Sequence, residues 1–383
     1  MERETALVVG GSNGIGLAIV LQLLERGYKK IYIVDRVEPD CDINNSIEFV
    51  RFNLLMDDYS IFDKFIDIDT LIITAGFGRI ALFEDLEEAE IINSFKVNAV
   101  SAIRIIKKFY NKLCENKNFY CAVMGSIAGL ISSPLFSVYS ATKASICKFI
   151  ESVNIELEMK GSPNRILNVS PGSIKGTKFY NGANDINLTA DLAKEILNKM
   201  FARDDIFIPD YENIYKDVLK RYQTNPHEFG IQSYEYKIKS GRASTKPQLR
   251  IGYLSGTFDL FHIGHLNILR RAKEYCDYLV VGVHKDGSHK NKEVYIPFNE
   301  RLEIVKNIKY VDRVIEALPE DDAVYDLIKY DFLFVGSDYK GSERFRRYEE
   351  YFKDKGVKII YFPYTKGTSS TQLRSAIDKL CKK

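Results

Sequence analysis

The sequence predicts an α/β protein with two doubly wound parallel sheets, the second smaller than the first. Short apolar stretches of strand length alternate with helical stretches along most of the chain, which is the pattern of βαβ units. A glycine-rich turn, "GGSNGIG", follows the first apolar stretch. The alternation stops over residues 233–248 and then restarts. Because single cores stop growing well before 383 residues, we expect two domains.

The first domain should begin with a strand over residues 5–9. Its letters, "TALVV", form the short apolar run typical of a strand that is buried on both faces. The stretch 17–27 has helical spacing and ends on a glycine, a common helix C-cap, and residues 30–35, "KIYIVD", give the next strand. Later strands are expected within 70–76, 120–126 and 165–172.

A polar, basic segment separates the two domains. Residues 233–248, "SYEYKIKSGRASTKPQ", lack periodicity and contain Gly241 and Pro247. We take them as a linker between a first domain of residues 1–232 and a second of residues 249–383. In the second domain, strands are expected within 249–256, 278–283, 331–336 and 357–363, and helices within 265–275 and from residue 299.

Composition argues against several classes of function. The formal net charge is only +2 and the basic residues are spread along the chain, whereas a nucleic-acid binder concentrates them. The six cysteines include no CxxC pair, which favours reduced thiols over metal ligands. The chain shows no signal-peptide pattern and no apolar run approaching the roughly 20 residues of a membrane helix. We therefore expect a cytoplasmic enzyme with no nucleic-acid or membrane partner.

The glycine-rich turn is suited to a pyrophosphate. Gly10, Gly14 and Gly16 lie between a strand and a helix, where the lack of side chains lets backbone amides approach a phosphate. The same spacing also occurs in purely structural tight turns. Asp35 ends the second strand, where a carboxylate accepts hydrogen bonds from ribose hydroxyls. The neighbouring Arg36 would instead suit a 2′-phosphate, so the carboxylate favours NAD(H) without excluding NADP(H).

A second motif, "YSATK", places Tyr139 and Lys143 four residues apart in an expected helix, hence on one face. An ammonium beside the phenol stabilises phenolate, so we expect the pKa of Tyr139 to be lowered. Ser126, at the end of a strand, can hydrogen-bond the oxygen of a reacting carbonyl. The alternative is a tyrosine–lysine surface pair, which is common on any helix.

Residues 1–230 resemble the short-chain dehydrogenase/reductases. Besides the glycine turn and Ser126, Tyr139 and Lys143, the resemblance rests on Asn98 in "KVNAVSA" and on "SPGSIKGT" at 170–177. It implies that these four polar residues form a catalytic tetrad, with Asn98 holding a proton-relay water through a helix kink. It also implies a Rossmann-like fold, and an NAD(P)H hydride transferred to a ketone carbon while Tyr139 protonates the oxygen. The residues expected to bind the cofactor are Gly10, Ser12, Asn13, Gly14, Ile15, Gly16, Asp35, Arg36, Ala75, Gly76, Tyr139, Lys143, Pro171 and Gly172.

Three basic residues near this site could bind a substrate phosphate. Arg79 follows the "TAG" turn, and Lys175 and Lys178 lie in the loop after Pro171, which covers the substrate in the family just named. Two or three cations converging on one mouth would suit a phosphate. The alternative, that they are solvated loop charges, stays open.

In the second domain, "GTFDLFHIGH" places His262 and His265 three residues apart at the expected start of a helix. Both can point toward an anion, to which the helix dipole and free amides add attraction. A metal site is the rival interpretation, but no third histidine or cysteine follows in a zinc-like spacing. The pattern favours phosphate binding, and we expect no protein-bound metal.

Residues 249–379 resemble the nucleotidyltransferases of the glycerol-3-phosphate cytidylyltransferase type. The resemblance rests on the HxGH motif, "FNERLEIVKNIKYVDRVI", "FVGSDYKG" and "TKGTSSTQLR". It implies that His262 and His265 stabilise an in-line displacement on CTP, with Mg²⁺ neutralising the triphosphate. Tyr364 stands where an arginine is common, and Arg374 or Lys366 could compensate. The residues expected to bind CTP are Gly256, Thr257, Phe258, His262, His265, Lys290, Lys292, Arg301, Asp338, Ser369, Ser370 and Thr371.

The two resemblances together imply one pathway. A reductase can make an alditol phosphate from a keto-sugar phosphate, and a cytidylyltransferase can activate it as a CDP-alditol for a surface polymer. We expect ribulose or xylulose 5-phosphate as substrate, giving CDP-ribitol or CDP-arabinitol; CDP-glycerol from dihydroxyacetone or its phosphate is the alternative. A catalytically silent reductase scaffold or a nucleotide sensor are the rival classes. A homodimer or higher homo-oligomer through the helix from Phe149, "FIESVNIELEM", is also expected, unless that apolar face is buried within the monomer.

Overall fold

The computed structural model describes residues 4–39, 45–177, 179, 184–241, 249–286, 294–365, 367–368 and 370–381, with backbone alone at 371, 378, 380 and 381. The chain divides into two compact units, residues 1–248 and 249–383. A helix, α7 (Pro226–Lys239), extends into the segment 233–248 that the sequence predicts to be an irregular linker. That part of the prediction is wrong because Asn225 caps a helix there and Pro226 starts it, signals that outweigh the polar composition.

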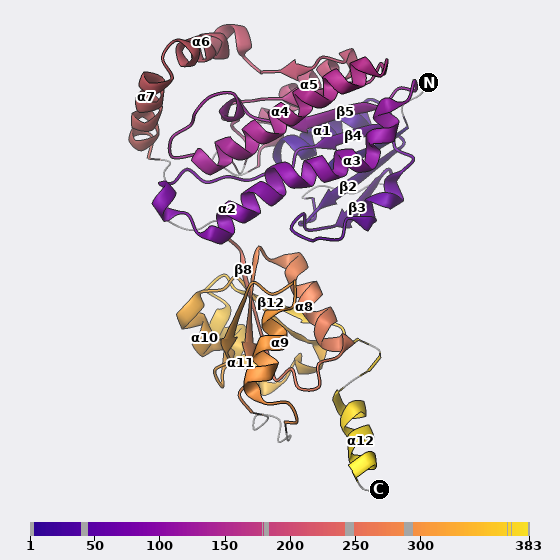
Figure 1. Ribbon diagram of the computed structural model, residues 1–383, viewed down its shortest axis with the longest axis vertical. Coiled ribbons are helices and arrows are strands. Elements are labelled where there is room, and N and C mark those ends of the chain that lie inside the picture. The colour runs from indigo at the N-terminus through magenta and orange to yellow at the C-terminus, as the bar shows by residue number, and fades with distance from the viewer. Residues whose placement is uncertain are drawn as a thin grey trace. The chain divides into compact units, whose positions relative to one another are not determined.

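The first unit is built on a seven-stranded parallel sheet (Figure 1). Its order is β3-β2-β1-β4-β5-β6-β7, so the chain reverses direction across the sheet between β1 and β4, the switch point of a doubly wound fold. The strands are β1 (Thr5–Val9), β2 (Lys30–Asp35), β3 (Ile47–Arg51), β4 (Thr70–Ile73), β5 (Tyr120–Met124), β6 (Ile166–Val169) and β7 (Ile206–Phe207). All adjacent pairs are parallel.

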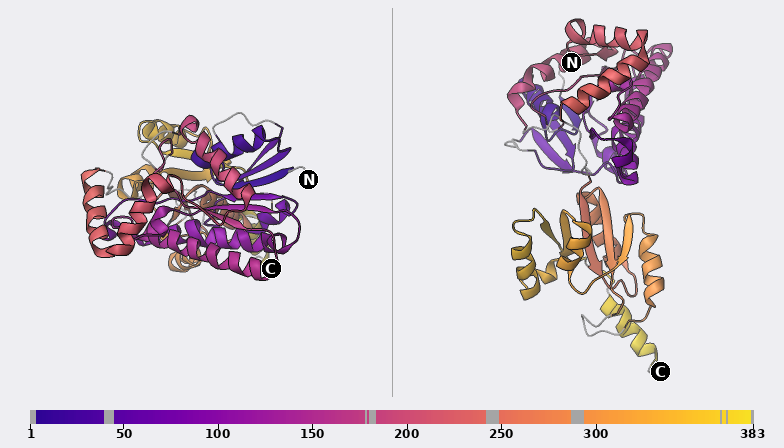
Figure 2. Two further views of the ribbon diagram at one scale, coloured as in Figure 1. Left: turned by 90° about the horizontal axis from the view of Figure 1, so that it is seen from above. Right: turned by 90° about the vertical axis from the view of Figure 1, so that its left-hand side faces the viewer.

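Helices cover both faces of this sheet, as Figures 1 and 2 show. One face packs on α3 and α4 through Ile105 and Ile146, and the other on α1 and α5 through Val20 and Ile196. The helices are α1 (Gly14–Glu25), α2 (Glu88–Phe95), α3 (Ser101–Cys114), α4 (Ser137–Met159), α5 (Ala190–Ala202), α6 (Lys216–Thr224) and α7. Because all strands are parallel, their carboxyl ends lie along one edge of the sheet, and the first site forms at that edge.

The second unit repeats the architecture on a smaller scale, with a five-stranded parallel sheet of order β10-β9-β8-β11-β12. The strands are β8 (Ile251–Gly256), β9 (Tyr278–Val283), β10 (Arg313–Glu316), β11 (Phe332–Gly336) and β12 (Lys358–Phe362). The helices are α8 (Ile263–Tyr275), α9 (Phe298–Lys306), α10 (Asp321–Ile328), α11 (Glu343–Phe352) and α12 (Ser370–Cys381). Residues of α8 and α9 pack on one face of the sheet and those of α10 and α11 on the other. The predicted fold class is confirmed.

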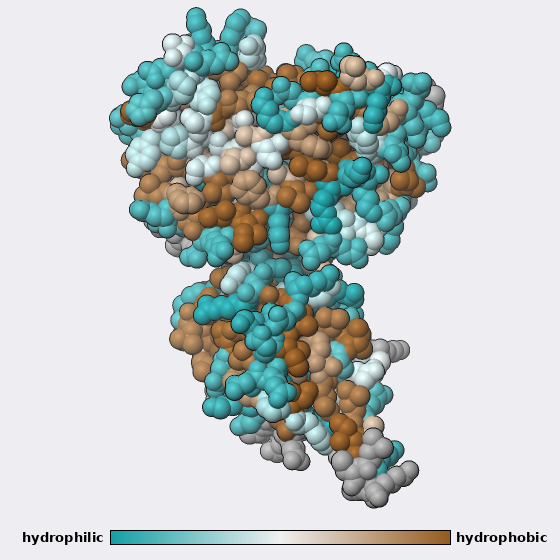
Figure 3. Space-filling view, in the orientation of Figure 1, coloured by the Kyte–Doolittle hydropathy of each residue, from teal (hydrophilic) through white to brown (hydrophobic). Residues whose placement is uncertain are grey.

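Hydrophilic and hydrophobic residues are interleaved on the face of each unit drawn in Figure 3. Exposed apolar side chains include Ile155 and Met159 on α4, of which Met159 is 82% exposed. Among the described helices, none is long and apolar enough to cross a membrane. Four cysteines in the described part are free thiols, and three of them are buried.

Candidate functional site

The glycine turn of the first unit is shaped by close backbone contacts. Gly10 has φ +87°, and a Cβ there would lie 2.5 Å from the backbone nitrogen of Ala75. A Cβ on Gly16 would overlap the carbonyl oxygen of Gly10. Side chains are therefore excluded on both sides of the turn, which brings the N-terminus of α1 up to the carboxyl ends of β1 and β4.

Asp35 ties the end of β2 to this turn. One carboxylate oxygen accepts a hydrogen bond from the backbone nitrogen of Ser12 at 3.2 Å, and the other accepts one from the nitrogen of Arg36 at 2.7 Å. The carboxylate thus lies beside the turn, where a bound dinucleotide would place its adenosine ribose.

Asn98 lies in a π-helical turn, Lys96–Val100, that links α2 to α3. Its side-chain oxygen accepts from the backbone nitrogen of Phe77 at 2.9 Å, and its side-chain nitrogen donates to the carbonyl of Phe77 at 2.8 Å and to the hydroxyl of Thr142 at 3.1 Å. π-Bulges of this kind are frequent at functional sites. The helix irregularity that the resemblance implies at Asn98 is present as this π-helical turn. The hydrogen bond to Thr142 connects Asn98 to the helix of the YSATK motif.

Ser126, Tyr139 and Lys143 converge beside Asn98. Ser126 follows β5 and hydrogen-bonds the phenol of Tyr139. Tyr139 and Lys143 project from α4, with the ammonium 5.7 Å from the centre of the phenol ring and donating to the carbonyl of Met124 at 2.7 Å. Gly76 lies where a Cβ would be 3.2 Å from Asn98 Oδ1 and 3.4 Å from Lys143 Nζ. All four polar side chains are buried, so they form a site rather than a surface pair.

In the second unit, His262 is the N-cap of α8. Its Nδ1 accepts a hydrogen bond from the backbone nitrogen of Gly264 at 3.0 Å, and its Nε2 lies 2.9 Å from the hydroxyl of Ser370. Burial lowers the pKa of His262, so the ring is neutral at pH 7. Because Nδ1 accepts, the proton is on Nε2 and can be donated. The ring of His265 stacks on that of His262 at 3.9 Å.

A cavity of about 350 Å³ opens in front of these histidines. It lies at the carboxyl ends of β8 and β11, the switch point of the second sheet, which is where α/β folds bind nucleotides. Of the residues expected to bind CTP, it is lined by Gly256, Thr257, Phe258, His262, His265, Asp338 and Ser370. The turn before α8 is strained, since Phe258 and Leu260 have φ of 53° and 47°.

Comparison with known proteins assigns each unit to a family. The short chain dehydrogenase model matches residues 4–186 and the cytidylyltransferase-like model matches residues 253–376. The second region is 36% identical over 126 residues to the glycerol-3-phosphate cytidylyltransferase of Bacillus subtilis, covering 32% of this chain and 92% of that protein. The first is 30% identical over 185 residues to an uncharacterized short-chain type dehydrogenase/reductase of Sinorhizobium fredii, y4eK, covering 47% of this chain and 73% of that protein.

The chain joins a short-chain dehydrogenase domain to a cytidylyltransferase domain. A crystal structure of a short-chain dehydrogenase from Streptomyces avermitilis has the fold of the first domain, with a TM-score of 0.50 and 19% identity, covering 62% of this chain and 99% of that one.

The charge state of the dehydrogenase tetrad differs from the sequence prediction. Burial raises the pKa of Tyr139 although the Ser126 hydrogen bond opposes the rise, so the phenol is protonated at neutral pH. Burial also lowers the pKa of Lys143 to about 8. The expected lowering of the phenol pKa by the lysine is therefore wrong for the protein without a cofactor, because desolvation of both groups outweighs their attraction.

The lowered pKa of Lys143 predicts a pH dependence of ketone reduction. Above about pH 8 the ammonium loses its proton, so the rate should fall as pH rises through that value. Initial rates of cofactor oxidation between about pH 6 and about pH 10 measure it. In Lys143→Arg the fall should move to higher pH, since a guanidinium stays charged. An unchanged alkaline limb in that variant would contradict the assignment.

Arg79 does not provide the open phosphate contact that the sequence suggests. Its guanidinium is buried and donates to both carboxylate oxygens of Glu90, at 3.1 and 2.8 Å, and to the carbonyl of Asp85 at 2.6 Å. The Arg79–Glu90 pair lines a small cavity beside Tyr139, so Arg79 helps to form the wall of the site. Lys175 is exposed in its loop, and Lys178 lies outside the described residues.

Aromatic side chains dominate the mouth at Tyr139. Phe136 stacks on the Tyr139 ring with 4.2 Å between centroids, and Phe179 lies 5.1 Å from the same ring. Tyr215, in the π-helical turn Tyr211–Tyr215, covers Gly172 so closely that a Cβ on that glycine would overlap its hydroxyl. Pro171 next to it accepts a hydrogen bond from the backbone nitrogen of Ile127 at 3.0 Å. No sequence pattern predicts the place of Tyr215, because it follows from the path of the chain after β7.

Arg301 of the cytidylyltransferase domain has a different role from the predicted CTP contact. It is 1% exposed and donates to four backbone carbonyls, those of Thr257, His284, Lys285 and Ile296. Because its guanidinium donates to these carbonyls, Arg301 fixes the segments that follow β8 and β9. Arg301 is not among the residues that line the cavity. The structure thus gives Arg301 backbone partners, which the sequence could not reveal because an arginine near a nucleotide motif looks the same whether it binds phosphate or backbone.

Asp259 is a residue that sequence reasoning missed. It is 2% exposed, accepts from the backbone nitrogens of Tyr295 and Ile296, and forms an ion pair of 2.7 Å with Arg374. Both Asp259 and Arg374 line the cavity. Lys290, Lys292, Lys366 and Ser369 lie outside the described residues, as does the side chain of Thr371, and Tyr364 is exposed at the cavity.

Proposed function

We propose that this chain reduces a keto-sugar phosphate to an alditol phosphate with NAD(P)H and then transfers a cytidylyl group from CTP to it, giving a CDP-alditol and pyrophosphate. The observation that carries the proposal is the presence, in one chain, of a buried Asn98–Ser126–Tyr139–Lys143 site and of a histidine-lined cavity at a second switch point. The product of the first reaction has the phosphate that the second reaction requires.

The first site fits a dinucleotide. Gly10, Gly16 and Gly76 keep open a cradle that side chains would fill, and Asp35 lies beside it. Bound there, a nicotinamide cofactor would supply the hydride. The phenol of Tyr139 is protonated and would donate its proton to the carbonyl oxygen of the substrate. Ser126 would hydrogen-bond that oxygen, and the ammonium of Lys143 would stabilise the phenolate left on Tyr139.

Asp35 supports a preference for NADH over NADPH. Its carboxylate would repel a 2′-phosphate on the ribose beside it. We predict that Asp35→Ser lowers kcat/KM for NADH by about tenfold, the value of one good hydrogen bond to a charged group, and raises it for NADPH. The measurement is the ratio of the two kcat/KM values. Arg36→Ala is the matched control and should lower only the NADPH value; an unchanged ratio in Asp35→Ser would contradict the assignment.

In the cytidylyltransferase domain, the phosphate oxygen of the alditol phosphate would attack the α-phosphorus of CTP, and pyrophosphate would leave. The Nε2–H of His262, which lies against the hydroxyl of Ser370 at the start of α12, would donate to a phosphate oxygen, and so would that hydroxyl. Within the described residues, no three His, Cys, Asp or Glu side chains are placed together to hold a metal ion. We therefore propose that Mg²⁺ binds with the triphosphate, whose charge it would neutralise.

The leading substrate is a ketopentose 5-phosphate, ribulose or xylulose 5-phosphate, and the product CDP-ribitol or CDP-arabinitol for a surface polymer such as a capsule or teichoic acid, made in the cytoplasm. CDP-glycerol synthesis is the alternative, favoured by the similarity to the glycerol-3-phosphate cytidylyltransferase of Bacillus subtilis. A homodimer is proposed through α4, where Ile155 is 60% exposed.

The two activities of the full-length protein can be assayed separately. NADH oxidation is followed with ribulose 5-phosphate, xylulose 5-phosphate and dihydroxyacetone phosphate, and pyrophosphate release with CTP, Mg²⁺ and the matching alditol phosphates. The proposal expects one ketose phosphate and its own alditol phosphate to be the preferred pair. No oxidation with any ketose phosphate, together with transfer to a supplied alditol phosphate, would instead support a silent reductase scaffold.

A further inference from the structure

The cavity of the cytidylyltransferase domain is lined differently on the two faces of the sheet. On the face of α8, the lining includes the aromatic rings of Phe334 and Phe362 together with the polar side chains of His262, His265 and Arg271. On the opposite face, that of α10 and α11, the lining includes Ser255, Asp321 and Arg344. Ser255 follows Leu254 of the α8 face along β8, and successive side chains of a strand alternate between faces. Ser255, Asp321 and Arg344 therefore form a polar group, which we name the polar end of the cavity, on the face of the sheet opposite Phe334 and Phe362.

Asp321 starts α10 at the polar end with its carboxyl group incompletely paired. The side chain is 6% exposed. The backbone of Asp321 is fixed, since its nitrogen donates to the hydroxyl of Tyr348 and its carbonyl accepts from Tyr330. Oδ2 lies 3.8 Å from the guanidinium of Arg344, whereas Oδ1 is buried and has no hydrogen-bond partner among the described residues. Burial raises the pKa of this carboxyl, with the nearby Ser255 hydroxyl opposing the rise.

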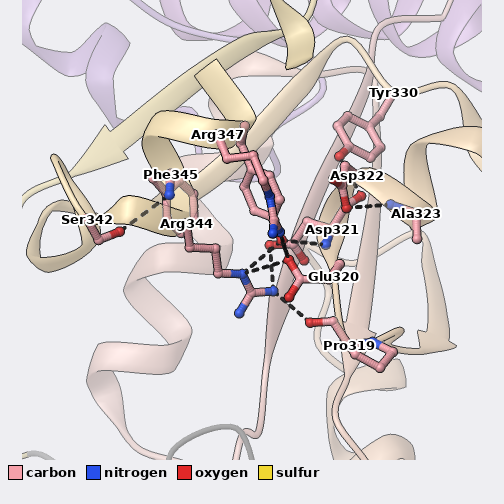
Figure 4. Close-up of polar contacts among 11 residues, drawn as sticks. Pro319, Glu320, Asp321, Asp322, Ala323, Tyr330, Ser342, Arg344, Phe345 and Arg347 are labelled. Atoms are coloured by element: carbon pink, nitrogen blue, oxygen red, sulfur yellow. Dashed lines mark hydrogen bonds and ion pairs between the residues drawn. The ribbon is translucent and has the colours of Figure 1, made fainter. Parts of the chain in front are cut away.

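Arg344 and Arg347 lie among the carboxyl groups of Glu320, Asp321 and Asp322 (Figure 4). Arg344 donates to the hydroxyl of Tyr348 and to the carbonyl of Pro319, both at 2.8 Å, and lies 3.4 Å from Glu320. Arg347 pairs with the same Glu320. A phosphate would meet Asp321 and Glu320 as well as the arginines, so this end does not suit an anion. It suits a neutral group that both donates and accepts hydrogen bonds.

We propose that Ser255, Asp321 and Arg344 bind the hydroxyl groups of the alditol chain and thereby set the length of the acceptor. The inference rests on the proposed cytidylyl transfer to an alditol phosphate. A chain hydroxyl would donate to the free Oδ1 of Asp321 and accept from Arg344, which satisfies a buried polar atom that is otherwise costly to leave unpaired. A shorter acceptor would leave it unpaired, and sites of this type reject such analogues strongly.

The cytosine base of CTP also has groups that donate and accept hydrogen bonds, so it competes with the alditol hydroxyls as the occupant of the polar end. A flat base gains most from aromatic contacts, which the cavity provides on the face of α8 with Phe334 and Phe362. The polar end is then left for the acceptor.

The test is acceptor selectivity in Asp321→Asn. We measure kcat/KM for ribitol 5-phosphate and for glycerol 3-phosphate, and separately the KM for CTP, in the full-length protein. The inference expects kcat/KM for ribitol 5-phosphate to fall about tenfold or more, that for glycerol 3-phosphate to fall less, and the KM for CTP to change by less than about twofold. The matched control is Asp322→Asn, since Asp322 is the next carboxylate, does not line the cavity and accepts from the nitrogen of Ala323.

The possible outcomes distinguish a wrong acceptor assignment at Asp321 from a failure of the proposed cytidylyl transfer itself. A raised KM for CTP with unchanged acceptor preference would place the base at Asp321 and overturn the inference. Ser255→Ala must shift acceptor preference in the same direction as Asp321→Asn, which keeps the test decisive if the buried Asn variant does not fold. If the wild-type protein transfers to neither acceptor while still binding CTP, the proposed function itself fails.

Discussion

Tyr139→Phe should abolish ketone reduction while leaving cytidylyl transfer unchanged. The substitution removes only the hydroxyl, and the ring keeps its 4.2 Å stack on Phe136. General acid catalysis contributes ~10²–10⁴-fold to a rate, so we expect kcat for NADH oxidation to fall about 10³-fold. Pyrophosphate release from CTP and a supplied alditol phosphate, measured on the same preparation, should match that of the wild type.

The matched control for this variant is Tyr110→Phe. Tyr110 lies on α3, away from the tetrad, and its hydroxyl is 3.4 Å from Glu156. Loss of the Tyr110 hydroxyl should change neither ketone reduction nor cytidylyl transfer. If Tyr139→Phe retained reduction within about tenfold of the wild type, Tyr139 would not be the proton donor, and the assignment of the whole tetrad would have to be withdrawn.

His262→Asn should have the converse effect, with cytidylyl transfer lost and reduction intact. Asparagine is a good N-cap, so α8 keeps its start, but the Nε2–H that faces Ser370 is removed. Removing one hydrogen-bond donor to a transition state costs ~10²–10³-fold in kcat, and we expect a loss of that size in pyrophosphate release.

His227→Asn serves as the comparison for the second variant, because His227 is exposed on α7 of the dehydrogenase domain. Thermal unfolding of both histidine variants should follow that of the wild type. Transfer activity that survived in His262→Asn would show that His262 shapes the turn without donating to the phosphates.

Much of the fold follows from the sequence because the central strands are buried on both faces. The strands at residues 5–9, 30–35 and 278–283 have the predicted bounds. The strands that the sequence did not predict, β3, β7 and β10, all lie at sheet edges. Their residues are mostly half-buried or exposed, so they lack the continuous apolar run that marks a central strand. The same cause hid α6 and α7, which are polar and largely exposed.

The site residues divide in a similar way. The Tyr139–Lys143 pair and the HxGH pair follow from motifs whose spacing is set by one helix or one turn. Asn98 and Ser126 come from other elements, the π-helical turn and the end of β5, and the family resemblance is what links them to the first pair. Arg79, Arg301, Asp259 and Tyr215 belong to no such motif, because their ion pairs, carbonyl partners or loop contacts are brought together only in the folded chain. Asp321 carries no motif at all, because its significance comes from the burial of an oxygen that nothing in the described structure pairs.

A single reaction tests whether one chain both makes an alditol phosphate and activates it. The protein is incubated with CTP, Mg²⁺, a ketopentose 5-phosphate and NADH that carries deuterium at the transferred position, and the products are examined by mass spectrometry. We predict a CDP-pentitol that is one mass unit heavier than the product made with ordinary NADH. A CDP product without deuterium, or a labelled pentitol phosphate that is never joined to CMP in the presence of CTP, would contradict the account.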